Sequence, residues 1–368
     1  VGWGVPLALA WTVVLGVFAV GVAHLEVETD ATRWFPPGNP VRDDYEGIRA
    51  DLSGISPVNV VLRASEGARV TEPDALRAID ALAAHLEARP DVGKAISIAD
   101  PLRQLHGGFV DDPARPLPDG EALVDQYLLL LEGEEEIADL VTRDRTAANI
   151  VIRANDNGSE ALLAIGKEAS RFWQERGVAD IEPRTTGIMY EFARAEDEIA
   201  MGQLRGLGLA LLAIATVLLG ALRRPSLALV SVVPNVVPIV MVFGFMGWSG
   251  IPLDAGTVIV GSLALGIAVD DTIHLVSAFR DARNAGTAPR LALDGAIRRV
   301  AHPLILTTLA VGLGFALLGL SQFTFTRNLG LLIAGTMTVC LLADLALLPA
   351  LLWGTDPGRR PGSSEAAN

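Results

Sequence analysis

Apolar residues gather in long segments along this chain, and the segment lengths predict how the chain is organised. Each segment is close to the roughly 20 residues that a helix needs to cross the hydrocarbon core of a bilayer. One segment is followed by a long polar stretch, and the others then follow in close succession. The pattern predicts six transmembrane helices, at residues 4–23, 204–222, 227–248, 254–279, 302–321 and 328–353.

The polar stretch after the first segment carries the patterns of strands and helices. Short runs rich in β-branched residues predict strands, and apolar spacings of three and four predict helices between them. Two strand–helix–strand units result, joined by the polar, proline-rich residues 107–145. Two such units in one domain favour a ferredoxin-like, split βαβ layout. The expected strands are 56–64, 92–98, 146–154 and 181–188, and the expected helices are 72–88 and 159–177.

Arginines are distributed unevenly over the connections, which predicts the orientation. The connection 222–226, the loop 280–301 and the tail are basic, whereas the alternate loops carry only Arg327. Because basic loops stay in the cytoplasm, we expect both termini inside and residues 24–203 outside a bacterial inner membrane. The predicted fold class is a membrane α-helical bundle of six transmembrane helices with an extracytoplasmic α+β domain. The expected divisions are a first transmembrane helix (1–23), the α/β domain (24–203), a five-helix bundle (204–353) and a disordered cytoplasmic tail (354–368).

Composition and motifs exclude several classes of function. The chain has 43 acidic and 29 basic residues and a net charge of −14, which is unsuited to nucleic acid. The sequence contains no G-x-S-x-G, H-E-x-x-H, C-x-x-C or Walker A motif. We therefore expect neither an enzyme nor a bound metal or cofactor. Without a Walker loop, an ion gradient is the expected source of energy.

The stretch "LGIAVDDTIH" (265–274) places two adjacent acids inside an apolar span. A carboxylate at the centre of a membrane helix costs about 2.5–3.5 kcal/mol on insertion scales, so such residues are usually functional. Adjacent acids favour a shared proton over two ionised groups. His274 follows Asp270 by four residues and Asp271 by three, so it can reach either on a helix. The stretch predicts a proton relay, with Asp270 as its main carrier.

Other spans offer polar groups at a similar depth. Asp270 and Asp344 each lie nine residues from the cytoplasmic ends of their spans. This distance is roughly 14 Å at a rise of 1.5 Å per residue. We predict a relay of Asp270, Asp271, Asp344 and His274, with Asn235, Thr307 and Thr308 as supporting polar residues. The alternative is that these groups are hydrogen-bonded contacts between helices, or, for His274, a solvated side chain.

Five motifs carry a resemblance to a known family. They are "FPPGNPVRDDY" (35–45), "PNVVP" (234–238), "GIPLDAGT" (250–257), "GIAVDDTIH" (266–274) and "DLALLPALL" (344–352). Together they resemble the MMPL-type hydrophobe exporters of the RND superfamily. Members usually consist of two similar halves, each with a large domain after its first span, and this chain resembles the second half.

The resemblance implies proton-driven export of lipid-like or amphiphilic molecules, with the outer domain as porter. It implies protons, a hydrophobic substrate, and a second half or another copy of this chain as partners. Asp270 matches the relay aspartate of the family. Asp271 stands where many relatives have tyrosine. The alternatives are a sterol-sensing-type lipid sensor and a SecD/SecF-like accessory to protein secretion. Gradient coupling by the acid pair fits the exporter and leaves the SecD/SecF-like alternative open.

Overall fold

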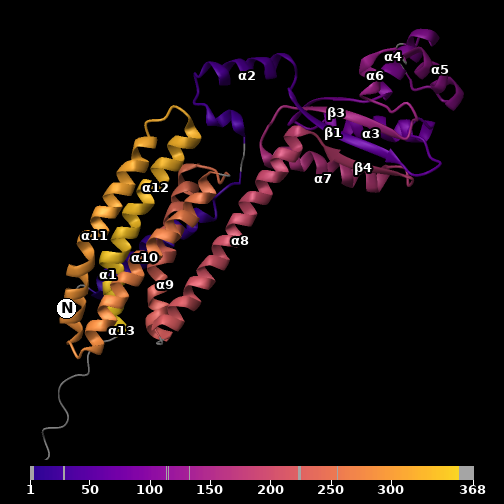
Figure 1. The fold of residues 1–368 in the computed structure, drawn as a ribbon. Coiled ribbons are helices and arrows are strands. Elements are labelled where there is room, and N and C mark those ends of the chain that lie inside the picture. Colours follow the sequence, from indigo (N-terminus) through magenta and orange to yellow (C-terminus); the bar gives the residue numbers. More distant parts are fainter. Residues whose placement is uncertain are drawn as a thin grey trace, which may run out of the picture. The chain divides into compact units, whose positions relative to one another are not determined.

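The computed structural model describes residues 4–27, 30–112, 114, 116–131, 133–222, 225–254 and 256–355. Nearly all of the tail predicted to be disordered lies outside these residues. The chain divides into two compact units (Figure 1). One unit is Glu28–Glu198, and the other combines Val1–Val27 with Ile199–Asn368.

The unit Glu28–Glu198 contains a four-stranded antiparallel sheet in the order β2-β3-β1-β4. The helix α3 (Pro73–Glu87) connects β1 to β2, and α7 (Ser159–Arg176) connects β3 to β4. All four strands and both helices form where the sequence predicts them. The strands are β1 (Ser56–Ala64), β2 (Val92–Ile96), β3 (Ala147–Ala154) and β4 (Ile181–Thr186).

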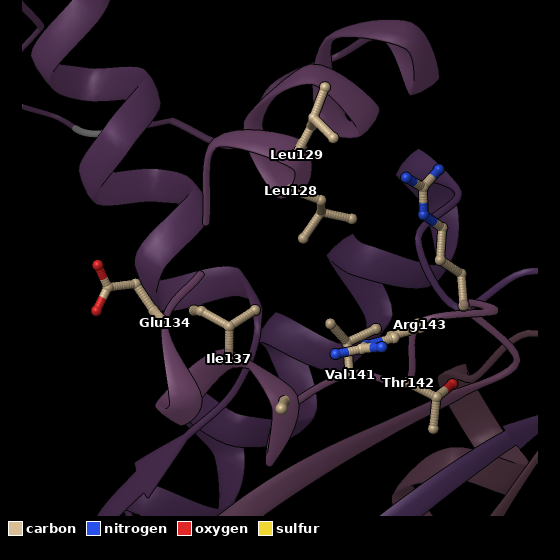
Figure 2. Close-up of a pocket in the computed structure, with 9 residues that line it drawn as sticks. Leu128, Leu129, Glu134, Ile137, Val141, Thr142 and Arg143 are labelled. Atoms are coloured by element: carbon tan, nitrogen blue, oxygen red, sulfur yellow. The ribbon is translucent and has the colours of Figure 1, made fainter. Parts of the chain in front are cut away.

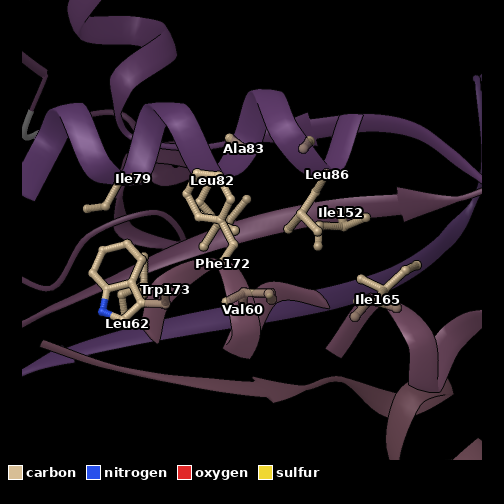
Figure 3. Packing of buried hydrophobic residues seen from close by; sticks show 14 of the residues in the cluster. Val60, Leu62, Ile79, Leu82, Ala83, Leu86, Ile152, Ile165, Phe172 and Trp173 are labelled. Atoms are coloured by element: carbon tan, nitrogen blue, oxygen red, sulfur yellow. The ribbon is translucent and has the colours of Figure 1, made fainter. Parts of the chain in front are cut away.

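One face of the sheet is covered by α3 and α7, and the core lies between these layers (Figure 3). Alternate residues of β1 point into it, since Val58, Val60 and Leu62 are fully buried. The side chain of Trp173 also enters this core, and its indole Nε1 donates to the carbonyl oxygen of Ile181 at 2.6 Å. The period-two pattern of the strand and the three–four spacing of the helices therefore meet on one apolar surface.

The polar stretch 107–145 is not the simple connection that the sequence predicts. It completes α4 (Ala99–Val110) and contains α5 (Glu121–Leu131) and the short α6 (Glu135–Ala138). These helices bury a second apolar cluster that includes Leu102, Val124 and Leu128. The helices of this stretch are short and are interrupted by prolines and acids, so their apolar spacing is hard to recognise in the sequence. Their apolar side chains form a core only together with Leu76 and Ile98.

Before β1 the chain forms a 3₁₀ helix, η1 (Ala31–Trp34), and the helix α2 (Pro40–Asp51). Gly38 has a φ of +83°, a value that glycine adopts without steric cost. Asn39 caps α2 by accepting from the backbone N–H of Val41 at 3.0 Å, and Pro40 occupies the first turn. The "PPGNP" part of the first motif is therefore a turn followed by a helix start.

The other unit is helical. Within the described residues five helices are long and apolar enough to cross a membrane, and α1 provides a shorter apolar stretch. Several helices extend beyond the predicted spans, and the predicted loop 280–301 is mostly helical, because charged residues continue the helices past their apolar parts. The helix α8 (Ile188–Leu222) begins in the unit Glu28–Glu198 and belongs to the helical unit from Ile199 onward. The other elements are α1 (Gly4–Val22), α9 (Pro225–Ser249), α10 (Thr257–Asn284), α11 (Pro289–Leu318), α12 (Thr324–Leu342), the π-helical turn η2 (Ala343–Leu347) and α13 (Leu348–Thr355).

Glycines bring α1 and α9 into close contact. A Cβ atom at Gly244 would collide with the backbone of Phe18, and one at Gly247 would collide with the carbonyl of Gly21. Small residues at such crossings are typical of helix packing in membranes, where close approach of the backbones replaces a hydrophobic driving force. The packing therefore makes α1 a component of the helical unit.

Candidate functional site

The two adjacent acids of α10 occupy different environments. Asp271 is 7% exposed and faces the interior of the helical unit. Asp270 has a side chain that is 74% exposed on the outer face of α10. Consecutive residues on a helix are about 100° apart, so neighbours in sequence need not share a surface. The predicted main carrier, Asp270, thus lies outside the packed interior of this chain.

Asp344 is the partner that α10 meets in the interior. The hydroxyl Oγ1 of Thr272 donates to Oδ1 of Asp344 at 2.8 Å. Thr272 is fully buried and Asp344 is 1% exposed. Asp271 lies close enough to interact electrostatically with Asp344. Asp271, Thr272 and Asp344 form a polar group, called here the inner carboxylate site.

The backbone at Asp344 is a π-helical turn, η2, between α12 and α13. A π turn interrupts the regular α-helical ladder and is often found at functional sites. The second oxygen of Asp344, Oδ2, is buried and has no hydrogen-bond partner among the described residues. A buried oxygen without a partner is costly, so its persistence points to a role that is not structural.

Asn235 lies in the interior on α9, the helix that packs beside η2. Its Nδ2 donates to the carbonyl oxygen of Ser231 at 2.7 Å, within the same helix. Its Oδ1 is buried and, in the part of the chain that is described, has no partner. Val237, two residues further, packs against Ala343 and Leu347 of η2. Asn235 therefore offers an unused acceptor on a helix adjacent to the inner carboxylate site.

The remaining predicted residues lie elsewhere. His274 is exposed, and its Nε2 lies 3.6 Å from Oδ1 of Asp270, so these two residues form an outer pair. Thr307 is exposed, and its hydroxyl donates to the carbonyl oxygens of Pro303 and Leu304 on its own helix. Thr308 is half-buried on the same helix. Neither threonine belongs to the inner carboxylate site, and the bonds of Thr307 are local ones of the kind common in membrane helices.

Thr272 is the site residue that the sequence analysis missed. It follows the acid pair directly and carries no charge, so nothing in its own chemistry distinguishes it. The signal lay in spacing, because Asp271, Thr272, Leu275 and Val276 continue one buried stripe along α10. A helical period applied to the whole span would have placed Thr272 on the same face as Asp271.

Two hollows are lined by other residues than those of the inner carboxylate site. A cavity of about 400 Å³ between α1, α9 and α12 is lined by apolar side chains such as Phe18, Phe245 and Leu332. A smaller hollow of about 100 Å³ lies between α5 and the segment that follows α6, beside Leu128 and Ile137 (Figure 2). Among the described residues, no group of three or more His, Cys, Asp or Glu side chains is arranged to hold a metal ion.

Known proteins are similar to this chain over different lengths. A protein of Methanocaldococcus jannaschii, named as a membrane protein, is 22% identical over 353 residues, covering 94% of this chain and 89% of the relative. One of Streptomyces coelicolor, also named as a membrane protein, is 30% identical over 160 residues, covering 43% of this chain and 22% of its own length. The protein patched homolog 1 of Caenorhabditis elegans is 32% identical over 117 residues, covering 32% of this chain and 8% of the relative. The chain thus spans most of the archaeal relative and a small part of the other two.

The sequence model of the MMPL family matches residues 33–361. This region includes nearly all of the unit Glu28–Glu198, the inner carboxylate site and, among the described residues, the five helices long enough to cross a membrane. The match confirms the resemblance drawn from the five motifs. The apolar helices and the relatives indicate a multi-pass membrane protein, and the chain belongs to the MMPL family.

Proposed function

We propose that this protein is a proton-coupled transporter that exports lipid-like or amphiphilic molecules from the inner membrane of a bacterium. Membership of the MMPL family supports an RND-type transporter. The observation that carries the proton step is the inner carboxylate site, where two acids and a hydroxyl meet in the interior of the helical unit. This arrangement favours transport driven by an ion gradient over catalysis.

The proton step is assigned to Asp344 and Asp271. Asp344 accepts one hydrogen bond from Thr272 and keeps a second oxygen unbonded. That oxygen is free to take up a proton without breaking an existing contact. Asp271 is buried next to Thr272 on α10 and contributes the second carboxyl group of the site. Thr272 positions the carboxyl group of Asp344 in this scheme.

The outer pair, Asp270 and His274, is assigned to an interface. A charged carboxylate facing lipid costs about 2.5–3.5 kcal/mol, so the exposed face of α10 is an unfavourable lipid contact. A second transporter half or a second copy of this chain would cover it and bring its own polar groups to Asp270. The functional unit would then contain two helical bundles, with Asp270 as a further proton carrier at their junction.

Six membrane spans and an outer porter domain complete the proposal. The glycine contacts between α1 and α9 support α1 as the sixth span. The strand order β2-β3-β1-β4, with antiparallel neighbours throughout, is the order of a ferredoxin-like split βαβ domain.

Cysteines placed at Ser65 and Ala285, both exposed, should react with an impermeant reagent from opposite sides of the membrane. Labelling of both from one side contradicts the orientation.

A sterol-sensing-type lipid sensor is the second candidate. The apolar cavity between α1, α9 and α12 favours it, because about 400 Å³ is enough to hold a lipid fragment within the helical unit. A sensor would bind its lipid without moving protons. The two functions therefore differ in proton flux.

Reconstituted vesicles distinguish the two functions. Proteoliposomes containing a trapped pH-sensitive dye are given a pH gradient, and total membrane lipid extract is the added substrate mixture. An exporter should dissipate the gradient faster when amphiphile is present, and Asp344→Asn should abolish the increase. Thr307→Val is the matched control, since Thr307 bonds only its own helix. Absence of any flux that depends on Asp344 would contradict the transporter.

A further inference from the structure

The motif "FPPGNPVRDDY" lines a cavity that the proton site does not use. The cavity holds about 340 Å³ within the unit Glu28–Glu198, inside the range of small-molecule sites. It lies between η1, α2 and the start of β1. Its apolar walls include Phe35, Val41, Ile55, Pro57 and Met189.

A closed hydrogen-bond network forms the polar wall of this cavity. The hydroxyl of Tyr45 and the Oγ of Ser56 lie 3.2 Å apart, and each also bonds the side chain of Asn157. Ser56 and Asn157 are buried. The three residues come from α2, β1 and the segment after β3, so the network ties separate elements together. Their polar groups bond one another, so the network joins the three elements along this wall.

The charged groups of the cavity are not equivalent. Asp30 accepts two hydrogen bonds from Thr32, from its backbone N–H at 2.9 Å and from its hydroxyl at 2.6 Å. Its other oxygen lies 3.6 Å from the guanidinium of Arg33. Arg42 donates one hydrogen bond, to the carbonyl oxygen of Phe35 at 3.2 Å, and has no acidic partner among the described residues. A guanidinium has five N–H donors, so Arg42 retains capacity for an anion.

We propose that this cavity binds a single-chain amphiphile with an anionic headgroup. The headgroup, a carboxylate or a phosphate monoester, bonds the guanidinium of Arg42, whose planar fork matches either group. The alkyl chain packs on Phe35, Ile55 and Met189. This inference names a substrate class for the proposed exporter and rests on that function for its purpose. Binding itself requires no proton gradient.

Photo-crosslinking of the full chain in lipid nanodiscs tests the site. The probe is palmitic acid with a diazirine on its chain, and labelled peptides are mapped by mass spectrometry. We expect labels on residues 30–57 and at Met189. Unlabelled palmitate or hexadecyl phosphate should compete, and the stronger competitor identifies the headgroup. Hexadecanol, which has the same chain without charge, should compete about ten-fold less well, because a hydrogen bond to a charged group is lost.

Variants of α2 separate headgroup recognition from folding. Arg42→Gln should weaken competition by the anionic amphiphile about ten-fold and leave that of hexadecanol unchanged. Arg42→Lys keeps the charge without the planar fork and should fall between the two. Arg49→Gln is the matched control on the same helix, because Arg49 pairs with Glu46 and does not line the cavity.

Three outcomes overturn the inference. They are labels confined to the helical unit, equal competition by hexadecanol and palmitate, and unchanged competition in Arg42→Gln. Asp344→Asn separates this inference from the proposed function. Normal labelling of that variant supports the cavity whether or not protons are transported. Absence of proton flux in the wild-type protein, with intact labelling, overturns the exporter and leaves the binding site.

Discussion

Replacing Thr272 with valine tests the geometry of the inner carboxylate site. Valine has the shape of threonine but lacks the hydroxyl that donates to Asp344 at 2.8 Å. The substitution opens no cavity, so the resulting loss of unfolding free energy measures the contribution of the hydrogen bond. After it, neither oxygen of Asp344 has a hydrogen-bond partner among the described residues.

The size of the cost depends on the charge of the acceptor. Hydrogen bonds between membrane helices contribute about 0.6 kcal/mol on average. Hydrogen bonds to charged groups contribute about 1.5–3 kcal/mol. Thr272→Val should therefore cost about 0.6 kcal/mol of unfolding free energy if Asp344 carries a proton, and about 1.5–3 kcal/mol if it is ionised. In an Asp344→Asn background the acceptor is always neutral, and the cost should be about 0.6 kcal/mol.

The measurement is reversible unfolding of the full chain by sodium dodecyl sulfate in mixed micelles, followed by circular dichroism. Thr272→Val is compared in the wild-type and Asp344→Asn backgrounds at several pH values. Thr336→Val is the matched control, because the buried hydroxyl of Thr336 donates to Leu332 in its own helix. Its cost should be the same in both backgrounds. The usual error of additivity is about 0.3 kcal/mol. If Thr272→Val lowers the unfolding free energy by less than this in both backgrounds, the hydrogen bond does not stabilise the fold.

Three further predictions concern other parts of the chain. Gly244→Val should lower the unfolding free energy by about 1–3 kcal/mol through overpacking against α1, whereas Gly16→Val, which meets open space, should be nearly neutral in the same assay. Asp270→Asn should change the stability of the single chain by less than about 0.5 kcal/mol, because the side chain is exposed, yet should abolish proton-driven flux in vesicles; normal flux would refute its place in the relay. The hydrogen bond from His85 lowers the pKa of Glu168 below its ordinary value of 4.5, so this stabilisation is present above that pH and is lost as the pH falls through the lower, folded value. Glu168→Gln should therefore differ from the wild type in thermal melts at neutral pH and converge with it in acid, and a constant difference would contradict this.

The sequence determined the membrane helices and the sheet through local periodicity. Long apolar runs predict spans because a helix needs about 20 apolar residues to cross a bilayer. For this reason five of the predicted spans correspond to the long apolar helices of the structure. Alternation in "SPVNVVLRA" placed Val58, Val60 and Leu62 on one face before any partner was known. The buried acids were also visible, since charge inside an apolar run needs no tertiary information to be recognised.

Tertiary structure alone decided which acid of the pair is buried. Asp270 and Asp271 have the same side chain and almost the same depth, and α10 is apolar on both sides of them. A helix that is apolar all round has no polar stripe to mark its outer face, so its rotation is set by packing against neighbouring helices. That packing turned Asp271 and Thr272 inward, and it brought Asp344, 72 residues from Thr272 along the chain, within hydrogen-bonding distance.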